Sequence, residues 1–122
     1  MSVPRRVARV YNQTQGTFLA ERAEVADGFL RRGLGLMGRR GWSRGDALII
    51  NPCNSIHCLF MRMAIDAVFV GADDSVRLAV SGIRPWTPAV LALGARYVIE
   101  LPAGTIERTR TSRGDRLSLE FC

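Results

Sequence analysis

Residues 65–80 read IDAVFVGADDSVRLAV, and they give the clearest indication of the fold class. Its first six residues, Ile65–Val70, are apolar apart from Asp66, and β-branched and aromatic side chains dominate them. Gly71, Ala72, Asp73 and Asp74 follow in a combination typical of a turn, and residues 76–80 are again mostly apolar. Two short runs around a turn predict two β-strands.

Similar short runs occur on both sides of this stretch. Each is four to six residues long and is bounded by Gly, Pro, Asn or Asp. Residues 6–11 and 16–19 predict a first hairpin, and four more runs predict single strands: 47–50, 56–61, 97–101 and 117–121. Strands at such regular spacing are typical of an all-β sandwich or barrel.

One segment has helical spacing instead. Apolar residues recur every three or four positions between Val25 and Met37, which predicts an amphipathic helix there. Gly28, Gly33 and Gly35 fall inside it and should shorten or interrupt it. The predicted fold class is therefore mainly β: an antiparallel β-sandwich or partly open barrel of about seven or eight short strands with one packed helix.

The chain has 122 residues, which is the usual size of one domain, and we expect residues 1–122 to form a single unit. Its net charge is +6, and every one of its 17 basic residues is arginine. Arginine suits phosphate and carboxylate groups, so the charge is consistent with an anionic partner; genomic nucleotide composition explains the same usage. Both explanations stay open.

Cysteine usage and hydropathy point to a cytoplasmic protein. Cys53, Cys58 and Cys122 make an odd number of thiols, which is no disulfide framework. No apolar run approaches the ~18 residues of a membrane-spanning helix, and the N-terminus lacks the apolar core of a signal peptide. We therefore expect no membrane partner.

Cys53 and His57 are the candidate catalytic residues, because an imidazole within reach of a thiol activates it as a nucleophile. The alternative is that Cys53 and Cys58 are small buried side chains. Zinc needs four converging ligands, and His57 and Cys58 are neighbours that would point to opposite faces of a strand. We expect no metal and no cofactor.

Two further features favour binding. The stretch from Arg31 to Arg44 contains five arginines, Trp42 and no acidic residue, a pattern that favours weak nucleic-acid binding or a solvated helix end. Asp66 begins an apolar strand. It is expected to be a solvated strand start, a carboxylate that accepts hydrogen bonds from backbone N–H groups, or a site residue.

Together, these segments resemble the DUF192 family, small bacterial and archaeal domains without a settled function. The resemblance runs through four blocks in order: Val25-Ala26 with Arg32 and Gly35-Leu36-Met37; Asp46-Ala47-Leu48 through Pro52-Cys53 and Ser55-Ile56-His57 to Met61-Arg62 and Ile65-Asp66; Pro85-Trp86; and residues 98–104 with Gly114-Asp115. It implies a β-rich, sandwich-like fold with a helix packed on it.

The resemblance also implies which polar residues matter. The family's recurrent positions fall on Arg32, His57, Asp66, Glu100 and Asp115, which we expect to cluster, with Met61 on the strand face of His57. The first hypothesis is a non-enzymatic binding or accessory domain whose small ligand or protein partner sits near His57 and Asp66. The second is a hydrolase or thiol-dependent enzyme that uses Cys53 and His57, and the third is a weak nucleic-acid binder.

Overall fold

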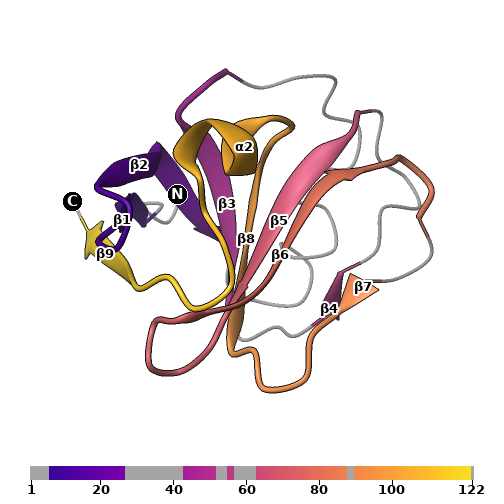
Figure 1. The fold of residues 1–122 in the computed structure, drawn as a ribbon. Coiled ribbons are helices and arrows are strands. Elements are labelled where there is room, and N and C mark those ends of the chain that lie inside the picture. Colours follow the sequence, from indigo (N-terminus) through magenta and orange to yellow (C-terminus); the bar gives the residue numbers. More distant parts are fainter. Residues whose placement is uncertain (1–5, 27–42, 52–54, 57–62, 88–89, 122) are drawn as a thin grey trace, which may run out of the picture.

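The structure, a computed structural model, describes residues 6–26, 43–51, 55–56, 63–87 and 90–121 (Figure 1). Strands make up most of the regular structure in these ranges. They are β1 (Val7–Asn12), β2 (Thr17–Ala26), β3 (Asp46–Ile50), β4 (Ser55–Ile56), β5 (Ile65–Val70), β6 (Val76–Ile83), β7 (Val90–Leu91), β8 (Tyr97–Pro102) and β9 (Leu117–Phe121), with one short helix, α2 (Thr105–Thr109).

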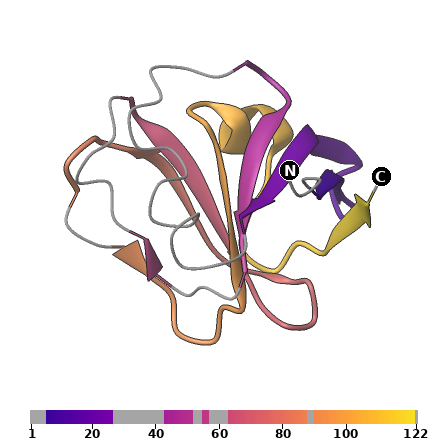
Figure 2. The same cartoon turned by 180° about the vertical axis from the view of Figure 1, so that it is seen from behind.

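Seven strands form one sheet in the order β6-β5-β8-β3-β2-β1-β9, which curls into a half-barrel, and β4 pairs with β7 in a separate small sheet. The first and last strands, β1 and β9, pair with each other, and β4 and β7 lie on the opposite side in both views (Figures 1 and 2). The predicted class, mainly β with one helix, is confirmed. Neighbouring strands are antiparallel except β2 and β3, which are parallel.

The hairpin predicted from residues 65–80 is formed by β5 and β6, which pair antiparallel. β8 lies on the other edge of β5, and all six residues of β5 are buried. A strand that is hydrogen-bonded on both edges and covered on both faces can be apolar along its whole length. This explains why the sequence signal is strongest here.

The predicted helix does not begin at Val25. Val25 and Ala26 are instead the last residues of β2, where they pair with Ile49 and Ile50 of β3. Residues 27–37, the rest of the predicted helix, lie outside the described part of the chain. The helix that the structure does contain, α2, was not predicted, since its five residues are too few for a helical period to show.

The sheet buries apolar side chains on both of its faces. Along β8, Ile99 and Leu101 join one cluster, which includes Ile106 of α2, and Val98 joins the other. This alternation is the two-residue period of a strand. α2 therefore packs on one face of the sheet, at the end of the half-barrel where the chain leaves β8 (Figure 1).

The described segments contain no helix that is both long enough and apolar enough to cross a bilayer.

Candidate anion-binding cavity

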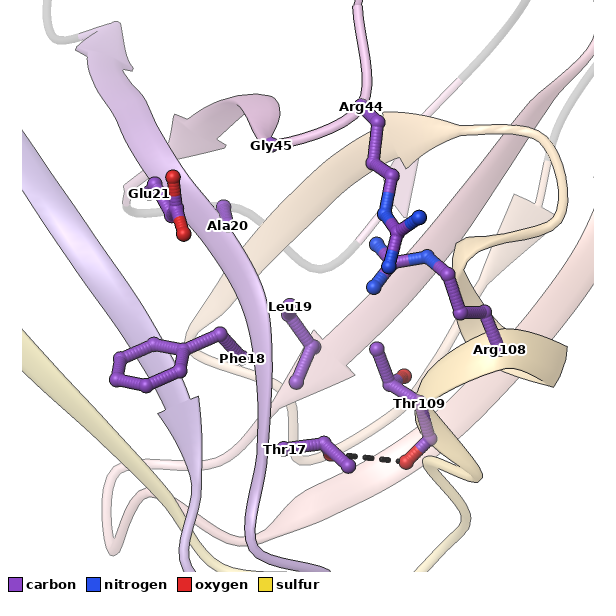
Figure 3. A pocket seen from close by; sticks show the side chains of 9 residues that line it. All are labelled: Thr17, Phe18, Leu19, Ala20, Glu21, Arg44, Gly45, Arg108 and Thr109. Carbon is purple, nitrogen blue, oxygen red and sulfur yellow. Dashed lines mark hydrogen bonds between the residues drawn. The ribbon is translucent and has the colours of Figure 1, made fainter.

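A cavity of about 550 Å³ lies between β2 and α2. Residues 17–21 of β2 form one side, the turn before β3 adds Arg44 and Gly45, and α2 adds Arg108 and Thr109 (Figure 3). Three segments that are far apart in sequence therefore meet around one space. Its size falls in the range of small-molecule pockets, roughly 300–1,000 Å³.

Two arginine side chains dominate the cavity. The guanidinium groups of Arg44 and Arg108 point toward one another (Figure 3). Partial burial and, next, the positive charge of Arg44 lower the pKa of the Arg108 guanidinium below its ordinary value. Within the described ranges, no carboxylate forms an ion pair with either group. Two like charges held this close favour an anion between them.

Hydrogen bonds made by Arg22 and Asp46 hold the backbone around Arg44 in place. Asp46 accepts hydrogen bonds from the Ser43 N–H (2.8 Å) and from Nε of Arg22 (3.0 Å), and Nη2 of Arg22 donates to the Arg44 carbonyl (3.0 Å). Gly45 adopts a positive φ of 95°, and a Cβ there would lie 3.0 Å from Nη2 of Arg22. The positive φ favours glycine at this position.

Asp66 holds the helix that carries Arg108. Its carboxylate is fully buried, and one oxygen accepts hydrogen bonds from the N–H groups of Gly104 (3.1 Å) and Ile106 (2.9 Å), at the start of α2. The other oxygen accepts from the Gly82 N–H (2.8 Å) on β6. Of the three roles expected for Asp66, the structure shows the carboxylate that binds backbone amides.

The far end of α2 is tied to β2. The Thr17 hydroxyl donates to the Thr109 carbonyl at 2.9 Å (Figure 3). The Thr109 hydroxyl donates to the Thr105 carbonyl at 2.8 Å. Both hydroxyls of the lining are thus used within the fold. Glu21, the acidic residue of the lining, lies 3.8 Å from Nη1 of Arg22. The described lining therefore presents guanidinium donors, and no pairing of a nucleophile with a base.

Asp66 and Glu100 do not form the expected cluster. They stand on neighbouring strands, but Asp66 pairs with Leu101 whereas Glu100 pairs with Ala67. Leu101 belongs to the apolar cluster on the α2 side, and Ala67 belongs to the cluster on the other face. The two carboxyl groups consequently point to opposite faces of the sheet, because side chains alternate along a strand.

Glu100 lies buried among apolar residues, with 6% of its surface exposed. Burial raises the pKa of its carboxyl to about 7. No hydrogen-bond donor or cation contacts this carboxyl in the part of the chain that the structure describes. Near neutral pH the group is therefore partly protonated, which lowers the cost of burying its charge.

Asp115 belongs to a polar network that continues through Asn12 and Thr111 to Thr109 of the cavity lining. It is buried, and its Oδ2 accepts hydrogen bonds from Nδ2 of Asn12 (2.9 Å) and from the Ser112 N–H (3.0 Å). These contacts join the end of β1 to the loop that follows α2. Asp115 therefore fastens the C-terminal segment to the sheet.

The remaining predicted site residues, Arg32, Cys53, His57 and Met61, lie outside the described part of the chain. The predictions for a thiol–imidazole pair and for the His57 face stay predictions. Within the described ranges, no three His, Cys, Asp or Glu side chains are grouped as metal ligands.

Sequence reasoning missed Arg108. Its partner Arg44 belongs to the basic stretch that was singled out, but Arg108 lies in a different block of the chain. One local signal was available: Gly104 precedes α2, and Glu107 occupies the first helical turn, where an acidic residue is favourable. That signal could have predicted the helix, but it does not indicate that Arg108 lies close to Arg44.

The comparisons with known proteins agree on one family. The sequence profile of DUF192, described as "Uncharacterized ACR", matches residues 10–119. A UPF0127 protein of Pyrococcus furiosus is 35% identical over 111 residues, which is 87% of this chain and 93% of that protein. A UPF0127 protein of Pyrococcus abyssi is 32% identical over 88% of this chain and 94% of its own.

A solved structure has the same fold. It comes from Sinorhizobium meliloti, is described as a candidate transcription regulator, and superposes with a TM-score of 0.83. The match covers 98% of this chain and 96% of the other, at 23% identity. At that identity the likeness extends to the fold alone.

Proposed function

Since the chain belongs to the DUF192 family, whose description assigns no activity, we propose a function from the cavity itself: the domain is a non-enzymatic binding module for a small anionic ligand. The observation that carries the proposal is the pair of guanidinium groups, Arg44 and Arg108, that face each other in the cavity without a carboxylate partner among the described residues (Figure 3). Arginine forks bind carboxylate and phosphate through paired, charge-assisted hydrogen bonds.

We propose a ligand position other than the one expected from the sequence. We expected a ligand near His57 and Asp66, but both oxygens of Asp66 already accept hydrogen bonds from backbone amides. Asp66 instead holds the start of α2, the helix that contributes Arg108 to the cavity. In the proposed site it is a positioning residue for Arg108 and makes no contact with the ligand.

The lining favours binding over catalysis. The hydroxyls of Thr17 and Thr109 donate to backbone carbonyls, so neither is available for activation by a base. Arginine holds its proton at any working pH and serves poorly as a general acid or base. The cavity is thus suited to holding charge rather than to moving protons.

Nucleic-acid binding is the second candidate. Arg44 is the last arginine of the basic stretch that begins at Arg31, and the Sinorhizobium meliloti neighbour is described as a candidate transcription regulator. We rank this function below the first because Glu21 lies in the lining, where a passing phosphate backbone would meet a negative charge. A single-stranded oligonucleotide should bind weakly, and its affinity should fall steeply with salt.

Sulfate is a suitable probe of the proposed function. Titration of the isotope-labelled protein should shift the NMR signals of the Gly45 and Thr109 amides, which lie in the lining. Arg44→Gln and Arg108→Gln should each weaken sulfate binding about tenfold, the effect of losing one hydrogen bond to a charged group. Arg96→Gln is the matched control, since Arg96 is exposed and lies before β8, at the other end of that strand from α2.

The proposal fails if sulfate leaves the lining amides unshifted. It also fails if Arg96→Gln weakens binding as much as the two cavity variants do, because binding would then reflect the general positive charge of the protein.

A further inference from the structure

The chemical class of the anion follows from the donors that the cavity offers. Each guanidinium presents several N–H groups in a planar fork, and the two oxygens of a carboxylate satisfy one fork completely. A carboxylate bound to Arg108 would leave the charge of Arg44 unmatched. Two facing forks instead suit a group with more than two acceptor oxygens.

The charge of the cavity also favours a group with more than two acceptor oxygens. Arg44 and Arg108 together carry two positive charges, and the lowered pKa of Arg108 reflects in part the repulsion from Arg44. A dianion would relieve this repulsion fully. A terminal phosphate carries a charge between −1.5 and −2 near neutral pH and has three acceptor oxygens, whereas a phosphodiester has one charge and two.

The other walls of the cavity restrict what the phosphate can be attached to. Leu19, Ala20 and Gly45 contribute no charge, and Glu21, paired with Arg22, places a carboxylate in the same lining. A second or third phosphate on the ligand would be repelled there. The volume of about 550 Å³ leaves room for a small organic group beside one phosphate.

Resting on the anion-binding function proposed above, we infer that the ligand is a small phosphomonoester, held by its terminal phosphate between the guanidinium groups of Arg44 and Arg108. Arg22 and Asp46 hold the backbone at Arg44, and Asp66 holds the start of α2, the helix that carries Arg108.

Calorimetric titration with three probes tests the assignment. At about pH 7.5, methyl phosphate should bind about tenfold more tightly than dimethyl phosphate or acetate, because it adds one further charge-assisted hydrogen bond. Arg44→Gln and Arg108→Gln should each abolish this preference. Arg96→Gln should retain it.

The pH dependence provides a second, independent readout. The second pKa of a phosphomonoester is near 6, so its affinity should fall about tenfold between about pH 7.5 and about pH 5. The charged groups facing the cavity are Arg44, Arg108 and Glu21, with Arg22 beside Glu21. Sulfate keeps its charge over this pH range and is the control for titration of these protein groups. If one of them titrated, the affinities for sulfate and for methyl phosphate would change together.

The outcomes separate this inference from the proposed function. If sulfate binds at the two arginines but dimethyl phosphate or acetate binds as well as methyl phosphate, the site stands and the phosphomonoester assignment is overturned. If neither sulfate nor methyl phosphate binds, both are overturned. If an oligonucleotide binds more tightly than methyl phosphate through the same arginines, the ligand is a nucleic acid and the inference is wrong.

Discussion

Glu100 illustrates how strongly the surroundings of one side chain can set its protonation. Burial raises the pKa of its carboxyl from 4.5 to about 7. Between about pH 4.5 and about pH 7, the folded protein therefore keeps a proton on Glu100 that the unfolded chain has already released. The contribution of Glu100 to the free energy of unfolding is greatest at acidic pH and is lost as the pH rises from about 4.5 to about 7.

Replacing Glu100 with glutamine should make the protein more stable above neutrality. Glutamine has nearly the same shape and carries no charge, so Glu100→Gln should raise the free energy of unfolding at about pH 8 by up to about 3 kcal/mol. At about pH 4 the two proteins should be nearly equal. Denaturant unfolding at several pH values measures this difference, and parallel pH profiles for the two proteins would contradict the assigned environment of Glu100.

The sequence could identify single residues better than it could assign their roles. Asp66 and Glu100 were both singled out, and both are buried. Their separation depends on strand register, since Asp66 pairs with Leu101 and Glu100 with Ala67. A register between strands that are about thirty residues apart is a tertiary property, and no local pattern encodes it.

At the scale of elements, α2 depends on Asp66 for its position. The two carboxylate oxygens accept three backbone hydrogen bonds, two from the start of α2 and one from Gly82 of β6. Asp66→Ala would leave these donors without a partner, at a cost of at least about 2 kcal/mol in the free energy of unfolding. The free energy of unfolding of Asp66→Asn should lie between those of Asp66→Ala and the unchanged protein. The single amide oxygen of asparagine can accept hydrogen bonds either from the start of α2 or from Gly82, but not from both.

Loss of the hydrogen bonds between Asp66 and α2 should also weaken ligand binding in the cavity. In Asp66→Asn, which should remain folded, sulfate affinity should fall although no ligand contact has been removed, because α2 carries Arg108. NMR signals of residues 105–109 should shift even without sulfate. Asp73→Asn, a change on an exposed turn, is the control and should leave sulfate affinity unaltered. Unchanged sulfate affinity in Asp66→Asn would show that α2 does not depend on this carboxylate.

Elements with a strong local pattern could be predicted. The hairpin of β5 and β6 is one, because an apolar run, a turn and a second apolar run follow each other directly. The end of β2 could not be predicted. Val25 and Ala26 fit a helical period as well as a strand, and their strand conformation depends on parallel pairing with β3, some twenty residues away.

At the scale of the whole molecule, the curl of the sheet creates the cavity. It brings residues 17–21, Arg44, Gly45, Arg108 and Thr109 around one space, although 92 positions separate the first from the last. A site assembled from three distant segments has no signature in any one of them. The sequence therefore predicted the architecture and gave the binding of backbone amides as one of three roles for Asp66, but it did not predict the arginine pair.

A crystal structure of the protein with bound methyl phosphate would show directly whether Arg44 and Arg108 hold a phosphate. We expect one phosphate between β2 and α2, with its oxygens about 2.7–2.9 Å from nitrogens of both Arg44 and Arg108, the usual length of such charge-assisted bonds. A phosphate bound elsewhere on the protein, or one that contacts neither guanidinium at saturating ligand, would contradict it.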